Sequence, residues 1–178
     1  GPKFSNDEII QYLNKIKVPY ITLNDDELFE LLAEELDKGK VIGWFNGSME
    51  FGPRSLGGRS ILGDPRNQKM QSLMNLKIKY RESFRPFAPS VLEEEVSNLF
   101  EMKGKSPYML LVAKVKKEIC TKMTEEQNSL FGIEKLNIPR SSIPAITHID
   151  YSARVQTVNF KTNPRYFNLI SAFKKRTN

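Results

Sequence analysis

Seven of the ten glycines in this 178-residue chain lie between Gly39 and Gly63, and arginines stand among them. Because glycine has no Cβ, such a segment can take positive φ angles and bring its backbone close to a bound molecule. Exposed backbone N–H groups and guanidinium groups both suit phosphate oxygens. The segment lacks the Gly-Lys-Ser/Thr end of a Walker A motif and the spacing of a GxGxxG fingerprint. We therefore predict a phosphate or nucleotide site of another kind around residues 50–60.

Positive charge is concentrated in the same region. The chain carries a net charge of +6, and residues 50–90 hold eight basic side chains against three acidic ones. If residues 76–82 were extended, their alternation would place Lys77, Lys79 and Arg81 on one face. A basic field of this kind favours an anionic partner: a phosphorylated small molecule, a nucleic acid or an acidic protein surface. A solvated basic face is the alternative. The basic residues are Arg54, Arg59, Arg66, Lys69, Lys77, Lys79, Arg81 and Arg85.

The remaining composition excludes several classes of protein. With Cys120 as the one cysteine and His148 as the one histidine, an internal disulfide framework and a Cys/His zinc site are impossible. No apolar run approaches the roughly 20 residues that span a bilayer. The length fits one domain, and residues 1–2 are typical of a remnant left by a protease. We expect a cytoplasmic protein without membrane contact and with no metal ligands of its own.

Hydrophobic spacing predicts a mixed α/β order. Helices are expected at 7–15, 24–39, 68–77, 93–100 and 163–174, and strands at 41–45, 108–115 and 153–159. Asn46-Gly47 predicts a tight turn that leads from the first strand into residues 49–51. Residues 116–142 are polar and lack a pattern, so they are expected to form a long loop or insertion.

Several long motifs, in order along residues 41–176, make the chain recognisable. They are 50–66, 75–92, 106–110, 143–150, 152–158 and 163–166. Together they resemble the C-terminal domain of the NodU/CmcH-type O-carbamoyltransferases. The resemblance implies a YrdC-like fold for residues 3–178: a twisted, largely open mixed β-sheet flanked by helices. It also implies that this domain makes carbamoyl-adenylate from carbamoyl phosphate and ATP. A separate, metal-carrying N-terminal domain would then transfer the carbamoyl group to a hydroxyl of a small metabolite.

The resemblance also implies roles for individual residues. Arg54 and Arg59 would hold phosphate or carbamate oxygens, and Arg154 would complete the charge cage. No general base is required, because a carbamate oxygen that attacks the α-phosphate is already anionic, and fixed cations balance the developing charge. Mg²⁺ is expected with ATP, without a ligand from this chain. The predicted catalytic residues are Lys79, Arg85 and Arg54, and the predicted binding residues are Arg54, Arg59, Lys79, Arg85, Arg154 and Ser152.

The chain differs from the family in two respects, and the sequence also leaves two other functions open. Relatives continue past the last helix with a strand and an Asn-Thr-Ser-Phe-Asn segment, so we expect a domain truncated at its C-terminal end. The insertion at 116–142 is also longer than in many relatives. A basic nucleic-acid-binding module without transferase activity is the main alternative, because Phe51, Tyr80, Phe84 and Phe87 stand among arginines. A non-catalytic interaction domain is the third.

Overall fold

The longest strand, β5 (Ser152–Val158), is the centre of a three-stranded sheet in a computed structural model that describes residues 1–178. It pairs in parallel with β3 (Ser90–Leu92), where Ser90 lies opposite Gln156. On its other side it pairs antiparallel with β4 (Leu111–Lys114), where Leu111 lies opposite Val155. Every residue of β5 except Arg154 is buried. Arg154, the exception, is one of the residues that line the cavity described below.

A second, two-stranded sheet carries the glycine-rich segment. Strand β1 (Ile42–Phe45) pairs antiparallel with β2 (Arg59–Leu62). The predicted continuation of the hairpin at residues 49–51 is wrong, since the partner of β1 begins at Arg59 and residues 46–58 form a long loop. The loop replaces strand pairing with contacts to the Glu50 side chain, described below. Trp44 is the one buried residue of strand β1.

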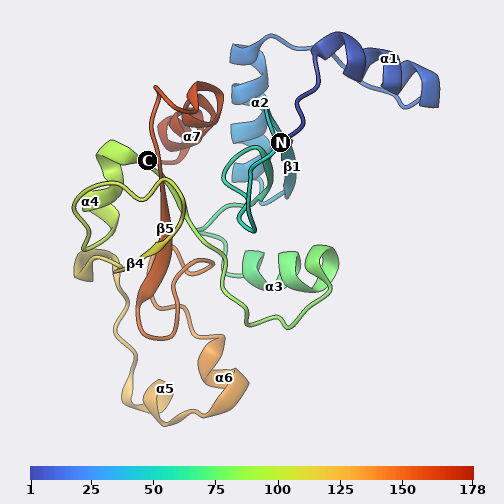
Figure 1. The fold of residues 1–178 in the computed structure, drawn as a ribbon. Coiled ribbons are helices and arrows are strands. Elements are labelled where there is room, and N and C mark those ends of the chain that lie inside the picture. Colours follow the sequence, from blue (N-terminus) through green and yellow to red (C-terminus); the bar gives the residue numbers. More distant parts are fainter.

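Two long helices lie against each other on one side of the molecule (Figure 1). Helix α2 (Asp25–Asp37) begins at Asn24, whose side chain accepts a hydrogen bond from the N–H of Glu27 in a capping box. Helix α7 (Pro164–Thr177) has a proline at its first position, where no N–H is needed. Both predicted starts are confirmed. Trp44, Phe29 and Leu169 form the core between these helices and the hairpin.

The other helices are short, apart from α1. Helix α1 (Asn6–Ile16) projects away from the rest and buries no residue (Figure 1). Helix α3 (Met70–Met74) continues as a π-helical turn at Asn75–Lys79, and α4 (Val96–Leu99) follows a 3₁₀ turn at Glu93–Glu95. No helix is long and apolar enough to cross a membrane. Seven helices and two small open sheets thus confirm the predicted mixed α/β class.

The polar segment 116–142 is more regular than predicted. After a 3₁₀ turn at Lys117–Ile119 it contains α5 (Glu125–Ser129) and α6 (Gly132–Leu136), neither of which has a buried residue. Both helices lie at one end of the molecule (Figure 1). Buried Arg140 donates hydrogen bonds to the carbonyls of Lys135, Leu136 and Ile138, and these local contacts shape a segment that has little apolar content.

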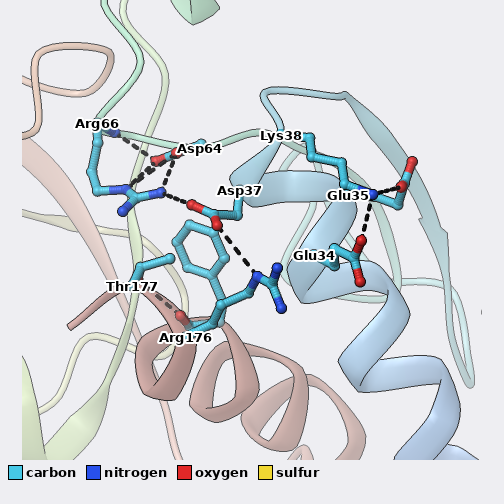
Figure 2. Close-up of polar contacts among 9 residues, drawn as sticks. Glu34, Glu35, Asp37, Lys38, Asp64, Arg66, Arg176 and Thr177 are labelled. Atoms are coloured by element: carbon cyan, nitrogen blue, oxygen red, sulfur yellow. Dashed lines mark hydrogen bonds and ion pairs between the residues drawn. The ribbon is translucent and has the colours of Figure 1, made fainter.

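An ion-pair network joins α2, α7 and the segment after β2 (Figure 2). The carboxylate of Asp64 is buried and accepts hydrogen bonds from Nε and Nη2 of Arg66 at 3.0 and 2.7 Å. Arg66 Nη2 also donates to Asp37 at 2.6 Å, and Asp37 accepts from Arg176 at 3.3 Å. The hydrogen bonds with Asp64, and then those with Asp37, raise the pKa of Arg66 against the effect of burial. Arg66 therefore stays charged and connects the three elements.

We expect Arg66→Gln to lower the free energy of unfolding by about 1–3 kcal/mol, because buried Asp64 would lose its charged donor. Urea denaturation measures the change. Lys69→Gln is the matched control, since it removes the same charge from an exposed side chain of the same segment. Equal stability of the two variants would contradict a stabilising role for the network.

Candidate anion-binding site

A cavity of about 400 Å³ lies between the β1–β2 hairpin, α3, β5 and α7. Four cationic side chains line it, and no aspartate or glutamate does. The cations come from segments far apart in sequence: the glycine-rich loop, the end of the π-helical turn and the central strand. They are Arg54, Lys79, Arg81 and Arg154.

Arg154 is the one of these four cations that has a buried polar atom, Nε, without a hydrogen-bond partner. Burial, and then the charge of nearby Arg54, lower the pKa of the Arg154 guanidinium. Two guanidinium groups that repel each other and lack a carboxylate partner are an unfavourable arrangement, which a bound anion would relieve. Arg54 and Arg154 therefore fit an anion with several oxygens, such as a phosphate group.

Lys79 and Arg81 both line the cavity, but the backbone before them is not extended, as the alternating pattern had required. Residues 75–79 are π-helical rather than extended, and Tyr80 then takes a left-handed conformation with φ of +48°. Residues two positions apart on a helical turn do not share a face, so Lys77 lies outside the cavity wall that Lys79 lines. The shared face of Lys77, Lys79 and Arg81 required an extended segment, and this condition is not met.

Buried Asn75 organises this turn. Its Oδ1 accepts a hydrogen bond from Arg81 Nε at 2.6 Å, and its Nδ2 donates to the carbonyls of Ser83 and Arg85 at 3.0 and 2.8 Å. The Arg81 guanidinium also lies 5.0 Å from the ring centre of Phe87. These contacts fix Arg81 at the cavity. Sequence reasoning did not assign a site role to Asn75 or Arg81, because the contacts join residues that are six to ten positions apart.

Two predicted arginines lie outside this wall. The Arg59 guanidinium donates to the carbonyl of Gly58 at 2.7 Å and lies 3.4 Å from the ring centre of Phe45. Arg85 forms an exposed ion pair with Glu82 at 2.7 Å. Arg59 is thus occupied by its own hairpin, whereas Arg85 is held only by a surface contact. Their binding roles stay predictions.

Ser152 lies in an adjoining cavity of about 320 Å³, which shares Arg154 as a wall. The Ser152 hydroxyl donates to Asp150 at 2.6 Å, and His148 lies 3.4 Å from the same carboxylate. The hydrogen bond from Ser152, and then the one from Lys114, lower the pKa of Asp150 against the effect of burial. Ser152 therefore has a structural partner in Asp150, and its predicted contact with substrate stays a prediction.

The cavity is also lined by apolar side chains. Burial raises the pKa of Tyr166 to about 12, so its hydroxyl is neutral at physiological pH. A lining that combines cationic and apolar side chains fits a ligand with an anionic end and a flat, weakly polar end, as a nucleotide has. The main apolar and aromatic residues of the lining are Leu36, Leu62, Met70, Met74, Leu169, Ile170 and Phe173.

The same residues do not fit a divalent cation held by the protein. Mg²⁺ binds carboxylate and other oxygen ligands, and the cavity wall offers no carboxylate. No group of three His, Cys, Asp or Glu side chains that could hold a metal lies anywhere in the structure. The lining thus fits an anionic ligand by charge and offers no carboxylate to a metal ion.

Comparison with known proteins shows the family to which the chain belongs. The sequence profile described as Carbamoyltransferase C-terminus matches residues 33–178, so the chain belongs to this family. The resemblance seen in the sequence is thereby confirmed.

Individual relatives agree with this assignment. The chain is 60% identical to the uncharacterized protein sll1178 of Synechocystis sp., over 99% of the chain and 29% of that protein. It is 40% identical to the nodulation protein NolO of Bradyrhizobium diazoefficiens, over 99% of the chain and 29% of NolO. It is 35% identical to the 3'-hydroxymethylcephem-O-carbamoyltransferase of Amycolatopsis lactamdurans, over 85% of the chain and 24% of that enzyme. The chain thus spans less than a third of the length of these relatives.

We expect Lys79→Ala to weaken binding of inorganic pyrophosphate by about tenfold, since a charge-assisted hydrogen bond contributes roughly 1.5 kcal/mol or more. Lys77→Ala is the matched control, because Lys77 lies two residues earlier and outside the wall. Isothermal titration calorimetry measures both. Equal weakening by the two variants would show that the anion responds to general surface charge rather than to the cavity.

Proposed function

We propose that this chain is the part of an O-carbamoyltransferase that binds carbamoyl phosphate and ATP and forms carbamoyl-adenylate. The observation that supports the proposal is the cavity, whose lining includes Arg54, Lys79, Arg81, Arg154 and apolar side chains but no acidic residue. Membership of the carbamoyltransferase family supports the choice of carbamoyl phosphate over other phosphorylated compounds.

The proposed reaction has two steps. Water first attacks the phosphorus of carbamoyl phosphate, and the bond from phosphorus to the carbamoyl oxygen breaks, so that carbamate leaves as an anion and inorganic phosphate keeps both protons of the water. A carbamate oxygen then attacks the α-phosphorus of ATP, forming a new P–O bond while the bond to pyrophosphate breaks. Pyrophosphate leaves with the electron pair of that bond. The guanidinium groups of Arg54 and Arg154 compensate the negative charge on phosphorus, and Lys79 holds the departing phosphates. Mg²⁺ would enter with the phosphates of ATP.

The later transfer belongs to the rest of the proposed enzyme. Since the relatives are more than three times as long as this chain, we propose that a separate N-terminal domain with a metal ion transfers the carbamoyl group to a hydroxyl of a small metabolite. A cytoplasmic location is part of the proposal, because ATP is available there. A YrdC-like arrangement, the domain boundaries 3–178 and the contributions of Arg59, Arg85 and Ser152 remain parts of it as well.

Nucleic-acid binding is the second candidate. Phe51 is fully exposed and Tyr80 is 86% exposed, so both rings are free to stack on bases near the cationic residues. The clustering of the cations in a cavity favours a small anion over a long polyanion. The two candidates differ in salt dependence, which is steep for a long polyanion that displaces many counterions.

The test uses the longer protein of which we propose this chain to be the C-terminal part. It is incubated with Mg²⁺, ATP and carbamoyl phosphate, and released pyrophosphate is measured. We expect release only when carbamoyl phosphate is present, and a loss on the order of a hundredfold in Arg54→Ala and in Arg154→Ala, because each removes a cation that stabilises the transition state.

Lys77→Ala serves as the control and is expected to retain wild-type rates. Pyrophosphate release that ignores carbamoyl phosphate would contradict the proposed reaction. Tight, strongly salt-dependent binding of a short duplex RNA without pyrophosphate release would favour the nucleic-acid module instead.

A further inference from the structure

We propose that Glu50 is a positioning residue, which holds the loop that carries Arg54 in the geometry needed to bind the anion. One oxygen of its carboxylate, Oε1, accepts hydrogen bonds from three backbone N–H groups of the same loop. These are the N–H groups of Leu56, Gly58 and Arg59, at 2.7, 2.6 and 3.2 Å. Since Glu50 precedes Arg54 and the three donors follow it, the carboxylate closes the loop around Arg54. This inference rests on the anion site of the proposed function.

The charge of Glu50 is part of the contact. Burial alone would raise the pKa of its carboxyl, but the hydrogen bonds from the three N–H groups, together with one from the backbone of Glu50 itself, outweigh burial and lower the pKa below the ordinary value. The carboxylate is therefore ionised at neutral pH, and the bonds are charge-assisted. Glu50 does not line the cavity, so its negative charge does not compete there with the anion. Its effect on binding would thus pass through the loop.

The opposite side of the loop is fixed to the core and to β5. Trp44 Nε1 donates to the carbonyl of Gly57 at 2.9 Å, and Gln156 Nε2 donates to the carbonyl of Leu56 at 2.9 Å. Gly57 takes a φ of +100°, and a Cβ at this position would overlap the ring of Tyr166. The loop can therefore approach the core only with glycine at position 57.

Gln156 links the loop to the second arginine of the site. It lies two residues after Arg154 on β5, so the two side chains share one face of the strand. Its Oε1 accepts from the Ser90 hydroxyl at 2.9 Å, which fixes the amide orientation that donates to Leu56. The loop that carries Arg54 is thereby attached to the strand that carries Arg154.

This attachment matters because Arg54 and Arg154 repel each other. The charge of Arg54 lowers the pKa of Arg154, and both side chains line the same cavity. Arg54 is exposed, so on a loop free to move its side chain would take many orientations, and each binding event would have to select the one that serves the anion. With Glu50 in place, the loop is ordered when the protein folds, so anion binding does not have to order it, and the two cations are already arranged for the anion.

The test is a double-mutant cycle on the 178-residue chain, read by calorimetric titration with inorganic pyrophosphate. We expect Glu50→Gln to weaken binding about tenfold, because the neutral amide oxygen holds the three N–H groups less firmly. Arg54→Ala should weaken binding by about tenfold or more in the wild-type background and by less than about threefold in the Glu50→Gln background. Arg54 can contribute little once its loop is released.

Three controls separate the possible outcomes. Glu94→Gln removes the same charge from an exposed glutamate and should leave binding unchanged. Thermal unfolding checks that each variant is folded at the titration temperature. Glu50→Asp keeps the charge but is one methylene shorter, and the same non-additivity is expected from it if Glu50→Gln does not fold.

Full additivity of the Glu50 and Arg54 effects would overturn the positioning role, because a residue that only stabilised the fold would leave the contribution of Arg54 intact. Wild-type binding in the Glu50 variants would overturn it as well. Unchanged binding in Arg54→Ala alone would instead contradict the proposed anion site. The two proposals can therefore fail separately.

Discussion

The site depends on the placement of two like charges, Arg54 and Arg154, in one cavity that no carboxylate lines. Arg54 is exposed and Arg154 is partly buried, and two free guanidinium groups in water would separate. Here each is held by a different part of the chain. Arg154 belongs to the central strand, which is otherwise buried, and Arg54 belongs to a loop fixed by Glu50, Trp44 and Gln156.

The two sheets and the long helices position the residues around the cavity. Strand β5 has a partner on both edges, so the position of Arg154 is set by the best-packed part of the fold. Helix α7 contributes Tyr166, against which Gly57 packs, and also part of the apolar wall. At the far end of α7, the Asp64–Arg66–Asp37–Arg176 network ties this helix to α2 (Figure 2). Helix α7, which lines the cavity, is thus held at one end by the contact of Tyr166 with Gly57 and at the other end by the ion-pair network.

Much of the fold could be predicted from local signals. Asn24 and Pro164 mark helix starts through capping and backbone restriction, which act within one turn. Strand β5 was evident from its alternation. The glycine-rich segment was correctly placed beside cationic residues, because both the flexibility and the charge are properties of that stretch itself. The resemblance to carbamoyltransferases assigned six residues to one site, of which Arg54, Lys79 and Arg154 line the main cavity and Arg59, Arg85 and Ser152 do not.

What the sequence did not reveal depends on contacts across a loop. The π-helical turn at Asn75–Lys79 was predicted as either helix or alternating strand, because the side-chain bonds of Asn75 that shape the next residues have no local pattern. Arg59 cannot be told from Arg54 by residue type, yet its guanidinium bonds to carbonyls of its own hairpin. Glu50 was part of a recognised motif, but its three donors are known only once the loop is closed.

The most direct test of this account is a crystal structure of the chain grown with inorganic pyrophosphate. The account predicts an anion in the main cavity, with oxygens within about 3 Å of the guanidinium groups of Arg54 and Arg154, as charge-assisted hydrogen bonds require. It also predicts that the contacts between Glu50 and the loop are the same with and without the anion. Pyrophosphate bound at Lys77 on the surface, with the main cavity empty, would contradict it.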